Sequence, residues 1–311
     1  MKVLITCPPM IAMIDKFRDL FGEKGIDIYY PEMVQALSED KLLSLVPEYD
    51  GWIIGDDPTT RKVLESGKNG LLKAAVKWGV GVDNIDFDAA NDLAIPIKNT
   101  PNMFGQEVGD ITMSYVTALA RKTFLVDREV KAGKWPKPRG ISLQGKTMGI
   151  VGFGDSGKAI AERALVSKMK VISYVRKQTT DIPDQLKQIT LSSWPEHIAE
   201  CDFIVFACSL NKDNWHMLDD EVLSKVKKGV RIVNVARGPL IHEEALVSAL
   251  QSGNVHSVAF DVFENEPLPL TSSLRNFEQC IFGSHNASNT ADAVIRTSQR
   301  ASQLLLEMLE K

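Results

Sequence analysis

Several classes of protein are excluded by what this chain of 311 residues has little of. It has four cysteines and no C-x-x-C pair, so thiols kept reduced in the cytoplasm fit the sequence better than a disulfide framework. Its net charge of −4 provides no basic field for nucleic acid or for an acidic membrane surface. No apolar stretch approaches the roughly 20 residues that a membrane-spanning helix needs. We therefore expect a cytoplasmic protein that binds neither nucleic acid nor a membrane.

The sequence also lacks the residue spacings of a metal site. It has five histidines, but it contains no H-E-x-x-H motif and no cluster of cysteine and histidine. We therefore predict that no metal takes part in the function.

The first hundred residues alternate between short apolar runs and segments with helical spacing. Pro8 and Pro9 interrupt the apolar start of the chain, which favours a first strand and a turn over a signal peptide. Such alternation predicts βαβ units and hence a parallel sheet. The predicted strands cover residues 2–6, 26–30, 51–55, 73–81 and 94–100.

Residues 105–131 contain few helix breakers, and we predict one extended helix that links two domains. A glycine- and proline-rich loop, 132–140, follows it. Beyond the loop, near-continuous apolar runs alternate with helical segments, which predicts a second, doubly wound parallel sheet. A length of 311 residues is itself more typical of two domains than of one.

The second series begins with a glycine motif. The stretch "GFGDSG" fits G-x-G-x-x-G through Gly152, Gly154 and Gly157, with Asp155 and Ser156 inside it. A predicted strand precedes the motif and a predicted helix follows it, which is the context that dinucleotide binding requires. There the backbone turns tightly beside a pyrophosphate, and the helix N-terminus offers N–H groups to it. The alternative is a glycine-rich turn without a ligand.

The end of the next strand bears on the choice of cofactor. An NAD-binding domain typically has Asp or Glu there to bind the ribose hydroxyls. This chain has Val175, followed by Arg176 and Lys177. No carboxylate would repel a 2′-phosphate, and two cations would attract it, so NADP(H) is favoured over NAD(H). The alternative is that Arg176 and Lys177 are solvated charges on a loop and do not bind the cofactor.

Three polar residues follow predicted strands of the second series, where open α/β sheets place their ligands: Arg237, Glu266 and His285. Hydride transfer to a ketone needs a cation that holds the substrate carboxylate, and the guanidinium fork of arginine suits it. It also needs an acid that protonates the new alkoxide, a role that suits histidine. A carboxylate beside that histidine would fix its tautomer and favour its protonated form. Each residue alone is more often a surface charge or a structural side chain.

Five stretches together resemble one family, the D-isomer-specific 2-hydroxyacid dehydrogenases, which includes phosphoglycerate, formate and glyoxylate/hydroxypyruvate enzymes. The resemblance extends over nearly the whole chain. The stretches are "KWGVGVDNIDFDAA", "GKTMGIVGFGDSGKAIA", "VNVARGPLIHEEAL", "AFDVFENEPL" and "GSHNAS".

The resemblance implies a role for each matching residue. Arg237 matches the arginine that grips the substrate, and Glu266 and His285 match the acid/base dyad. Asp261 matches the aspartate that binds the nicotinamide carboxamide. Val80 and Gly81 match a loop whose backbone amides hold the substrate carboxylate.

The resemblance also implies an architecture. It is α/β, with two doubly wound parallel-sheet domains, a Rossmann cofactor domain being inserted into a flavodoxin-like substrate domain. Residues 1–100 plus 284–311 would form the substrate domain, and residues 101–283 the NAD(P)-binding domain. The active site would lie in a cleft whose closure excludes water. The 105–131 helix resembles the dimerisation region of the family, so we expect a homodimer.

The sequence departs from the family pattern at several points. Asp56 and Asp57 follow the third predicted strand, where phosphoglycerate enzymes often carry an arginine, and only then come Arg61 and Lys62. Two carboxylates would oppose a substrate phosphate unless they face away from it. Gly109 replaces an alanine before the long helix. The short form of the chain is expected to lack the regulatory domain of long phosphoglycerate dehydrogenases.

The leading hypothesis is an NAD(P)-dependent 2-hydroxyacid dehydrogenase that works as a reductase of a small 2-oxoacid. Within the family, D-3-phosphoglycerate dehydrogenase stays open, because only a phosphate pocket would distinguish it. A different class also stays open, namely a cofactor-sensing interaction protein that resembles the co-repressors related to this family. The sequence does not identify the 2-hydroxyacid.

Overall fold

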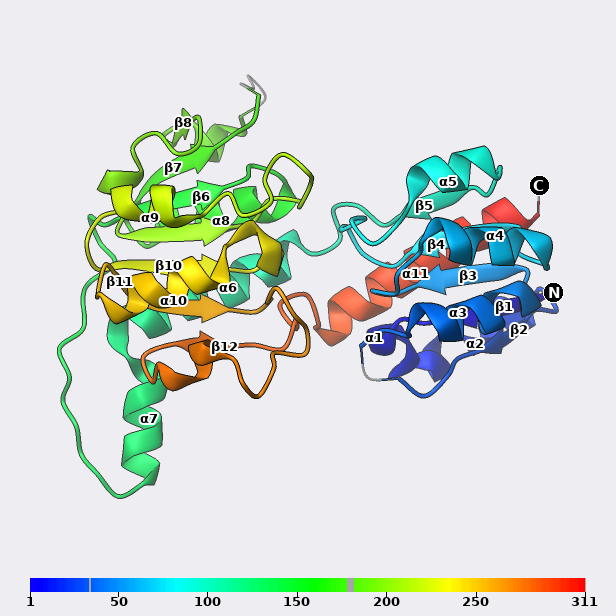
Figure 1. Cartoon of the computed structure of the whole chain (residues 1–311), viewed down its shortest axis with the longest axis horizontal. Helices are drawn as coiled ribbons and strands as arrows, with labels where there is room; N and C mark the ends of the chain where they lie inside the picture. Colours follow the sequence, from blue (N-terminus) through cyan, green and yellow to red (C-terminus); the bar gives the residue numbers. More distant parts are fainter. Residues whose placement is uncertain (34, 178–181, 311) are drawn as a thin grey trace. The chain divides into compact units, whose positions relative to one another are not determined.

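The computed structural model describes residues 1–33, 35–177 and 182–310. The chain forms two compact units (Figure 1). Unit 1 consists of Met1–Met103 and Asn289–Lys311, and unit 2 of Phe104–Ser288. Each unit contains one parallel sheet with helices on it, so the predicted fold class of two doubly wound α/β domains is confirmed.

Unit 1 has a five-stranded sheet in the order β2-β1-β3-β4-β5, which is the flavodoxin-like order. Every residue of β3 and β4 is buried, because helices cover both faces of the sheet. The strands are β1 (Lys2–Ile5), β2 (Asp27–Tyr29), β3 (Gly51–Ile54), β4 (Ala74–Lys77) and β5 (Ile97–Asn99).

The helices of unit 1 divide between the two faces of this sheet. One face carries α3 (Glu39–Leu45), α4 (Arg61–Asn69) and α5 (Phe87–Asp92), and the other carries α1 (Pro8–Ile11) and α11 (Ala291–Leu309). The indole of Trp78, just after β4, donates to Ser298 of α11 at 3.0 Å, so the C-terminal helix belongs to this unit. The unit also contains α2 (Arg18–Gly22) and the short 3₁₀ turns η1 (Ile14–Lys16) and η2 (Val46–Glu48).

Unit 2 has a seven-stranded sheet in the order β12-β11-β10-β9-β6-β7-β8. If β6 is counted as the first strand and the sheet is followed from β8, this is the 3-2-1-4-5-6 order of dinucleotide-binding sheets, with β12 as a further edge strand. The strands are β6 (Thr147–Val151), β7 (Lys170–Tyr174), β8 (Thr190–Ser192), β9 (Phe203–Phe206), β10 (Val230–Asn234), β11 (Val255–Phe260) and β12 (Ile281–Phe282).

Helices also cover both faces of the second sheet. On one face lie α6 (Gly105–Arg121) and α8 (Asp155–Val166), and on the other α9 (Asp220–Lys225) and α10 (Glu243–Gln251) (Figure 1). Short 3₁₀ turns occupy the connections: η3 (Asp184–Leu186), η4 (Ile198–Glu200), η5 (Gly238–Leu240) and η6 (Ser273–Asn276).

The predicted single helix over 105–131 is wrong in one respect. The structure contains two helices, α6 and α7 (Thr123–Lys131), because Lys122 between them adopts a left-handed conformation with φ of 58°. The Lys122 amide caps α6 by donating to the carbonyl of Ala118. No residue of α7 is buried, and α7 projects from the body of unit 2 (Figure 1).

Within the described ranges, the helices are all too short or too polar to cross a lipid bilayer.

Candidate active site

The three residues predicted to perform chemistry lie at one edge of the unit 2 sheet. Strands β10, β11 and β12 are parallel neighbours, and Arg237, Glu266 and His285 follow their carboxyl ends in that order. The loop after β10 and the loop after β11 touch each other directly. A Cβ added at Gly238 in the first loop would lie 1.9 Å from the carbonyl carbon of Phe263 in the second. The sheet therefore brings together the segments that carry all three residues.

His285 and Glu266 form a hydrogen-bonded pair. The distance from His285 Nδ1 to Glu266 Oε2 is 2.7 Å, and the two side chains are 25% and 23% exposed. The other carboxylate oxygen, Oε1, accepts from the Phe263 amide at 2.9 Å, which fixes the carboxylate on the loop. Because a carboxylate accepts at Nδ1, that nitrogen carries a proton, and Nε2 is the ring atom that would exchange a proton with a substrate.

The backbone of His285 is held in an unusual conformation. Its φ is 55°, a left-handed value that costs a non-glycine residue roughly 1 kcal/mol or more. Asp261 holds both sides of it: the Asp261 carbonyl accepts from the His285 amide, and Asp261 Oδ2 accepts from the Ala287 amide, each at 2.7 Å. Two short hydrogen bonds from one residue thus fix the turn that presents the imidazole.

The predicted role of Asp261 was binding to the nicotinamide carboxamide. In the structure Asp261 is 1% exposed, and its second oxygen, Oδ1, accepts from the hydroxyl of Tyr115 at 3.4 Å. Burial and the nearby charge of Asp261 raise the pKa of Tyr115, so this phenol keeps its proton and is the donor. Tyr115, on α6, was not singled out from the sequence.

Arg237 is positioned by Asn234, which the sequence analysis also did not single out. Asn234 ends β10, is fully buried, and donates from its side-chain amide to the Arg237 carbonyl at 2.9 Å. Its side-chain oxygen accepts from the Ala236 amide at 3.0 Å. Asn234 is an amide side chain at the end of a strand whose other residues, apart from Arg231, are apolar, and this is the sequence signal that would have indicated its role.

The glycine motif forms the turn from β6 into α8. Gly152 has φ of 107°, and a Cβ on Gly157 would lie 2.2 Å from the Gly152 carbonyl oxygen. Both positions therefore require glycine. At Gly154, by contrast, a Cβ would meet nothing within 4 Å, and this residue caps α8. The open space before a 12-residue helix suits a phosphate group that approaches the backbone.

The polar residues near this motif have different surroundings. Asp155 is exposed, and its Oδ2 accepts from the Gly105 amide at 2.8 Å, which joins the starts of α8 and α6. Ser156 is half-buried in the first turn of α8. Arg176 and Lys177 are exposed and follow β7, the sheet neighbour of β6.

Val80 and Gly81 lie in unit 1, in the loop after β4. Thr100 fixes this loop through its hydroxyl, which accepts from the Gly79 amide at 2.8 Å, and Asn99 donates to the Val80 carbonyl at 3.1 Å. Within the described part of the chain, neither the Val80 amide nor the Gly81 amide donates a hydrogen bond. Two adjacent amides of this kind are suited to an anion.

A buried lysine beside this loop was missed by the sequence analysis. Lys77, at the end of β4, is 3% exposed, and its Nζ donates to the Gly55 carbonyl at 2.6 Å and to Asp56 at 3.1 Å. Asp57 faces away from the surface, since it is fully buried and accepts from the amides of Leu37 and Gly55. Burial raises the pKa of Asp57.

Among residues 1–33, 35–177 and 182–310, no three His, Cys, Asp or Glu side chains are grouped so that they could hold a metal ion.

Comparison with known proteins identifies relatives over the whole chain. The family model described as "D-isomer specific 2-hydroxyacid dehydrogenase, NAD binding domain" matches residues 113–287. A hydroxypyruvate reductase of Thermotoga maritima is 34% identical over 283 residues, which are 89% of this chain and 88% of that protein. D-3-phosphoglycerate dehydrogenase 2, chloroplastic, of Arabidopsis thaliana is 36% identical over 92% of this chain but 46% of that protein. A solved glyoxylate reductase from Paecilomyes thermophila is 27% identical, with a TM-score of 0.84 over 100% of this chain and 95% of that one.

Proposed function

Because the chain belongs to the D-isomer-specific 2-hydroxyacid dehydrogenase family, we propose that it reduces a small 2-oxoacid to the D-2-hydroxyacid, with Arg237, Glu266 and His285 as the catalytic residues. The family makes it an oxidoreductase that uses a nicotinamide cofactor. The observation that carries the assignment of residues is the 2.7 Å contact between His285 Nδ1 and Glu266 Oε2, on loops that share a sheet edge with Arg237.

In this proposal His285 is the acid of the reduction. Its Nε2 donates a proton to the substrate oxygen as the carbonyl becomes an alkoxide. Glu266 holds Nδ1, fixes the tautomer and stabilises the imidazolium. The guanidinium of Arg237 binds the substrate carboxylate and polarises the carbonyl. In the same proposal the amides of Val80 and Gly81 are donors to a carboxylate, and for this reason we assign unit 1 as the substrate domain.

The residues of unit 2 fit a dinucleotide. Gly152, Gly154 and Gly157 shape the turn, and the start of α8 faces open space at Gly154. The bound cofactor supplies the hydride. We propose NADP(H) rather than NAD(H), with Arg176 at the 2′-phosphate, because Val175 and two exposed cations, Arg176 and Lys177, directly follow β7 where an acid would bind the ribose of NAD. Asp155 and Ser156 would lie beside the pyrophosphate in the same turn.

We also propose a homodimer formed through α7. No residue of α7 is buried in the single chain, and its side chains Phe124 and Val130 are 52% and 40% exposed. Large exposed apolar side chains on a projecting helix are typical of an interface. Light scattering after size-exclusion chromatography tests this proposal, and a monomeric mass at micromolar concentration would refute it.

For the substrate, we favour a 2-oxoacid without a second acidic group, in the class of glyoxylate and hydroxypyruvate. The cation of Lys77 beside the Val80 loop already has Asp56 as its partner, which leaves less attraction for a phosphate. D-3-phosphoglycerate dehydrogenase is the second candidate, because lysine is a common phosphate-binding residue and Lys77 lies beside the proposed substrate loop.

The test is oxidation of NADPH and NADH with glyoxylate, hydroxypyruvate, pyruvate and 3-phosphohydroxypyruvate, for the wild type and His285→Ala. We expect faster turnover with NADPH and loss of nearly all turnover in His285→Ala, with cofactor binding retained. Unchanged turnover in that variant would refute the role of His285. A clear preference for 3-phosphohydroxypyruvate would favour the second candidate. If no substrate turned over, cofactor-dependent partner binding would become the function to test.

A further inference from the structure

Two glutamates that take no part in the proposed chemistry join the segments that carry Arg237 and Glu266. Glu243 is the first residue of α10, which begins shortly after Arg237. Glu264 lies in the loop after β11, just before Glu266. The Glu243 amide donates to Glu264 Oε1, and the Glu264 amide donates to Glu243 Oε1, each at 2.9 Å. Each carboxylate therefore accepts from the backbone of the other residue, and we call the two residues the glutamate pair.

The glutamate pair and the proposed catalytic residues hold the same short loop. The Phe263 amide donates to Glu266 Oε1 at 2.9 Å, and the next amide, that of Glu264, donates to Glu243. Two successive amides of the loop are thus fixed, one on the Glu266 carboxylate and one on the start of α10. Because the Glu266 carboxylate also contacts His285 Nδ1 at 2.7 Å, its place relative to the imidazole depends on how firmly this loop is held.

A histidine lies beside the glutamate pair. His216 Nε2 is 3.1 Å from Glu264 Oε1, and the two side chains are 28% and 24% exposed. The ring of His242, the residue before α10, packs against the His216 ring with 4.7 Å between their centroids. Burial raises the pKa of Glu243, and the charge of Glu264 adds to this effect, whereas the hydrogen bond from the Glu264 amide opposes it. An imidazolium at His216 would offset part of the repulsion between the two carboxylates.

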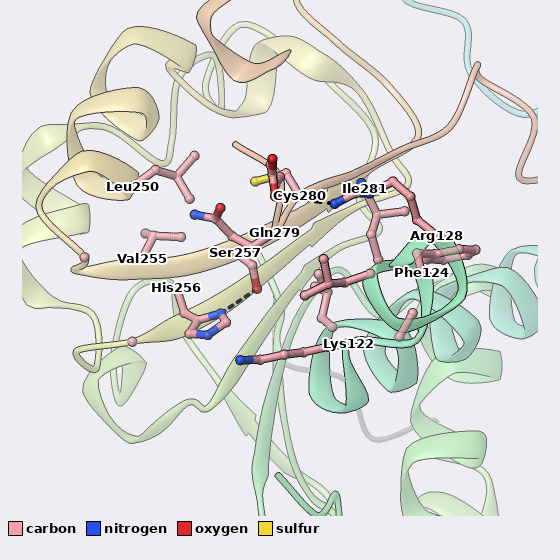
Figure 2. A pocket seen from close by; sticks show the side chains of 16 residues that line it. Lys122, Phe124, Arg128, Leu250, Val255, His256, Ser257, Gln279, Cys280 and Ile281 are labelled. Carbon is pink, nitrogen blue, oxygen red and sulfur yellow. Dashed lines mark hydrogen bonds and ion pairs between the residues drawn. The ribbon is translucent and has the colours of Figure 1, made fainter. Parts of the chain in front are cut away.

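The glutamate pair lies away from the surface through which we propose dimerisation. A cavity of about 490 Å³ borders α7 where β10, β11 and β12 begin, and Phe124 is among the residues that line it (Figure 2). Glu243 and Glu264 instead follow the carboxyl ends of β10 and β11. Since β11 has six residues, its two ends are about 20 Å apart at roughly 3.3 Å per residue. Substitutions in the pair should therefore leave dimer formation unchanged, and a change in turnover can be ascribed to the loop.

We propose that Glu243 and Glu264 are positioning residues for the proposed reaction, and that they hold the loop after β11 so that the Glu266 carboxylate meets His285. This role rests on the function proposed above. The two carboxylates act here as acceptors for backbone amides, and their charge is not required. Glutamine keeps an oxygen acceptor at either position, whereas alanine removes it, so a comparison of these variants separates position from charge.

The first test is an NMR titration of the His285 imidazole, which requires no substrate and whose signal is assigned by its absence in His285→Ala. Loss of the pair moves the Glu266 carboxylate away from the ring and disfavours the imidazolium. The titration midpoint should therefore fall by about 0.5–1 pH unit in Glu243→Ala and in Glu264→Ala. In Glu243→Gln and Glu264→Gln it should stay within about 0.3 pH unit of wild type, since the solvent screens the lost charge. An unmoved midpoint in both alanine variants, or equal falls in the alanine and glutamine variants, would overturn the proposal.

The second test measures whether the same loop controls catalysis. With the best 2-oxoacid, kcat of Glu264→Ala should fall about tenfold, because a small misplacement of a catalytic group suffices, while KM and the cofactor dissociation constant change less than twofold. In a Glu266→Gln background the same substitution should lower kcat less than twofold, since the charge that the loop positions is already absent. A full tenfold loss in that background would overturn the proposal. Glu244→Ala, at the exposed neighbour of Glu243, is the matched control and should equal the wild type.

The outcomes distinguish this role from the proposed function. Full turnover in His285→Ala would refute the function, and the titration would still decide the role of the glutamate pair. Loss of turnover in His285→Ala together with wild-type kcat in Glu264→Ala would overturn the positioning role alone. Melting curves establish that each variant is folded. If an alanine variant unfolds, Glu264→Asp serves in its place, because its shorter side chain withdraws the acceptor.

Discussion

Replacing Gly283 with alanine should impair His285 without removing any atom of it. A Cβ at this position would lie 2.1 Å from Asp261 Oδ1 and 2.6 Å from the Tyr115 hydroxyl. Side-chain carbon atoms do not approach an oxygen this closely, so the Asp261 carboxylate has to turn. Its other oxygen then loses the 2.7 Å hydrogen bond from the Ala287 amide, which helps to fix the turn around His285.

The magnitude follows from these contacts. A hydrogen bond to a charged group contributes about 1.5–3 kcal/mol, and an added methyl group in a packed interior costs about 1–3 kcal/mol. If about 2–3 kcal/mol of this total displaces the imidazole from its catalytic position, kcat falls by roughly 30- to 150-fold.

The assay measures kcat for reduction of the best 2-oxoacid, the dissociation constant of the reduced cofactor, and the melting temperature. We expect kcat to fall while cofactor affinity changes less than threefold. If Asp261 instead binds the carboxamide, the cofactor dissociation constant should rise with the fall in kcat. Gly22→Ala is the control, because nothing lies within 4 Å of its Cβ position. A Gly283→Ala enzyme with kcat within twofold of wild type would refute the reasoning.

Three further variants test other parts of the molecule. Glu266→Gln keeps an acceptor for His285 but loses the charge that stabilises the imidazolium, so kcat for reduction should fall about 10- to 100-fold. The alkaline limb of the pH profile for reduction should also move to lower pH, because His285 is the proton donor; an unshifted limb would contradict this. Burial acts to raise the pKa of Asp202, but the Lys227 ammonium and the Thr147 amide outweigh it and hold the pKa below 3.8. Asp202→Asn should therefore cost about 1–2 kcal/mol in urea unfolding above that pH, and the difference from wild type should vanish as the pH falls through the lowered pKa; a constant difference would count against it. Gly238→Ala places a Cβ 1.9 Å from a backbone carbon of Phe263, so a loss of more than about 3 kcal/mol is expected, and wild-type stability would show that the two loops do not touch.

The sequence predicted those features of the site that depend on residue type and local order. Gly152 and Gly157 were recognisable because a strand–turn–helix context limits what a glycine pair can do. The positions of Glu266 and His285 followed from strand ends, because parallel strands place their carboxyl ends at one edge. Their 2.7 Å contact agrees with the predicted pairing of a histidine with a carboxylate.

The residues that support the site were not predictable in the same way. Tyr115 reaches Asp261 across 146 positions of sequence, and no local pattern distinguishes it from the other apolar residues on α6. In the sequence, Lys77 is indistinguishable from an ordinary charged residue at the end of a strand. Only the structure shows that it is 3% exposed and donates to the Gly55 carbonyl. Such roles depend on which elements pack together, and the order of residues along the chain does not specify that.

The break between α6 and α7 escaped prediction for a different reason, and it provides a direct test. Helices that end in a left-handed residue usually have glycine there, but this chain has Lys122, with φ of 58°, so the sequence favoured one continuous helix. At a left-handed position glycine avoids a cost of about 1 kcal/mol that any residue with a Cβ incurs; inside a helix, alanine is favoured over glycine by about 1 kcal/mol. Lys122→Gly should therefore be more stable to urea than Lys122→Ala, by up to about 1 kcal/mol once the greater freedom of unfolded glycine is included. The opposite order of stabilities would mean that the helix continues through residue 122.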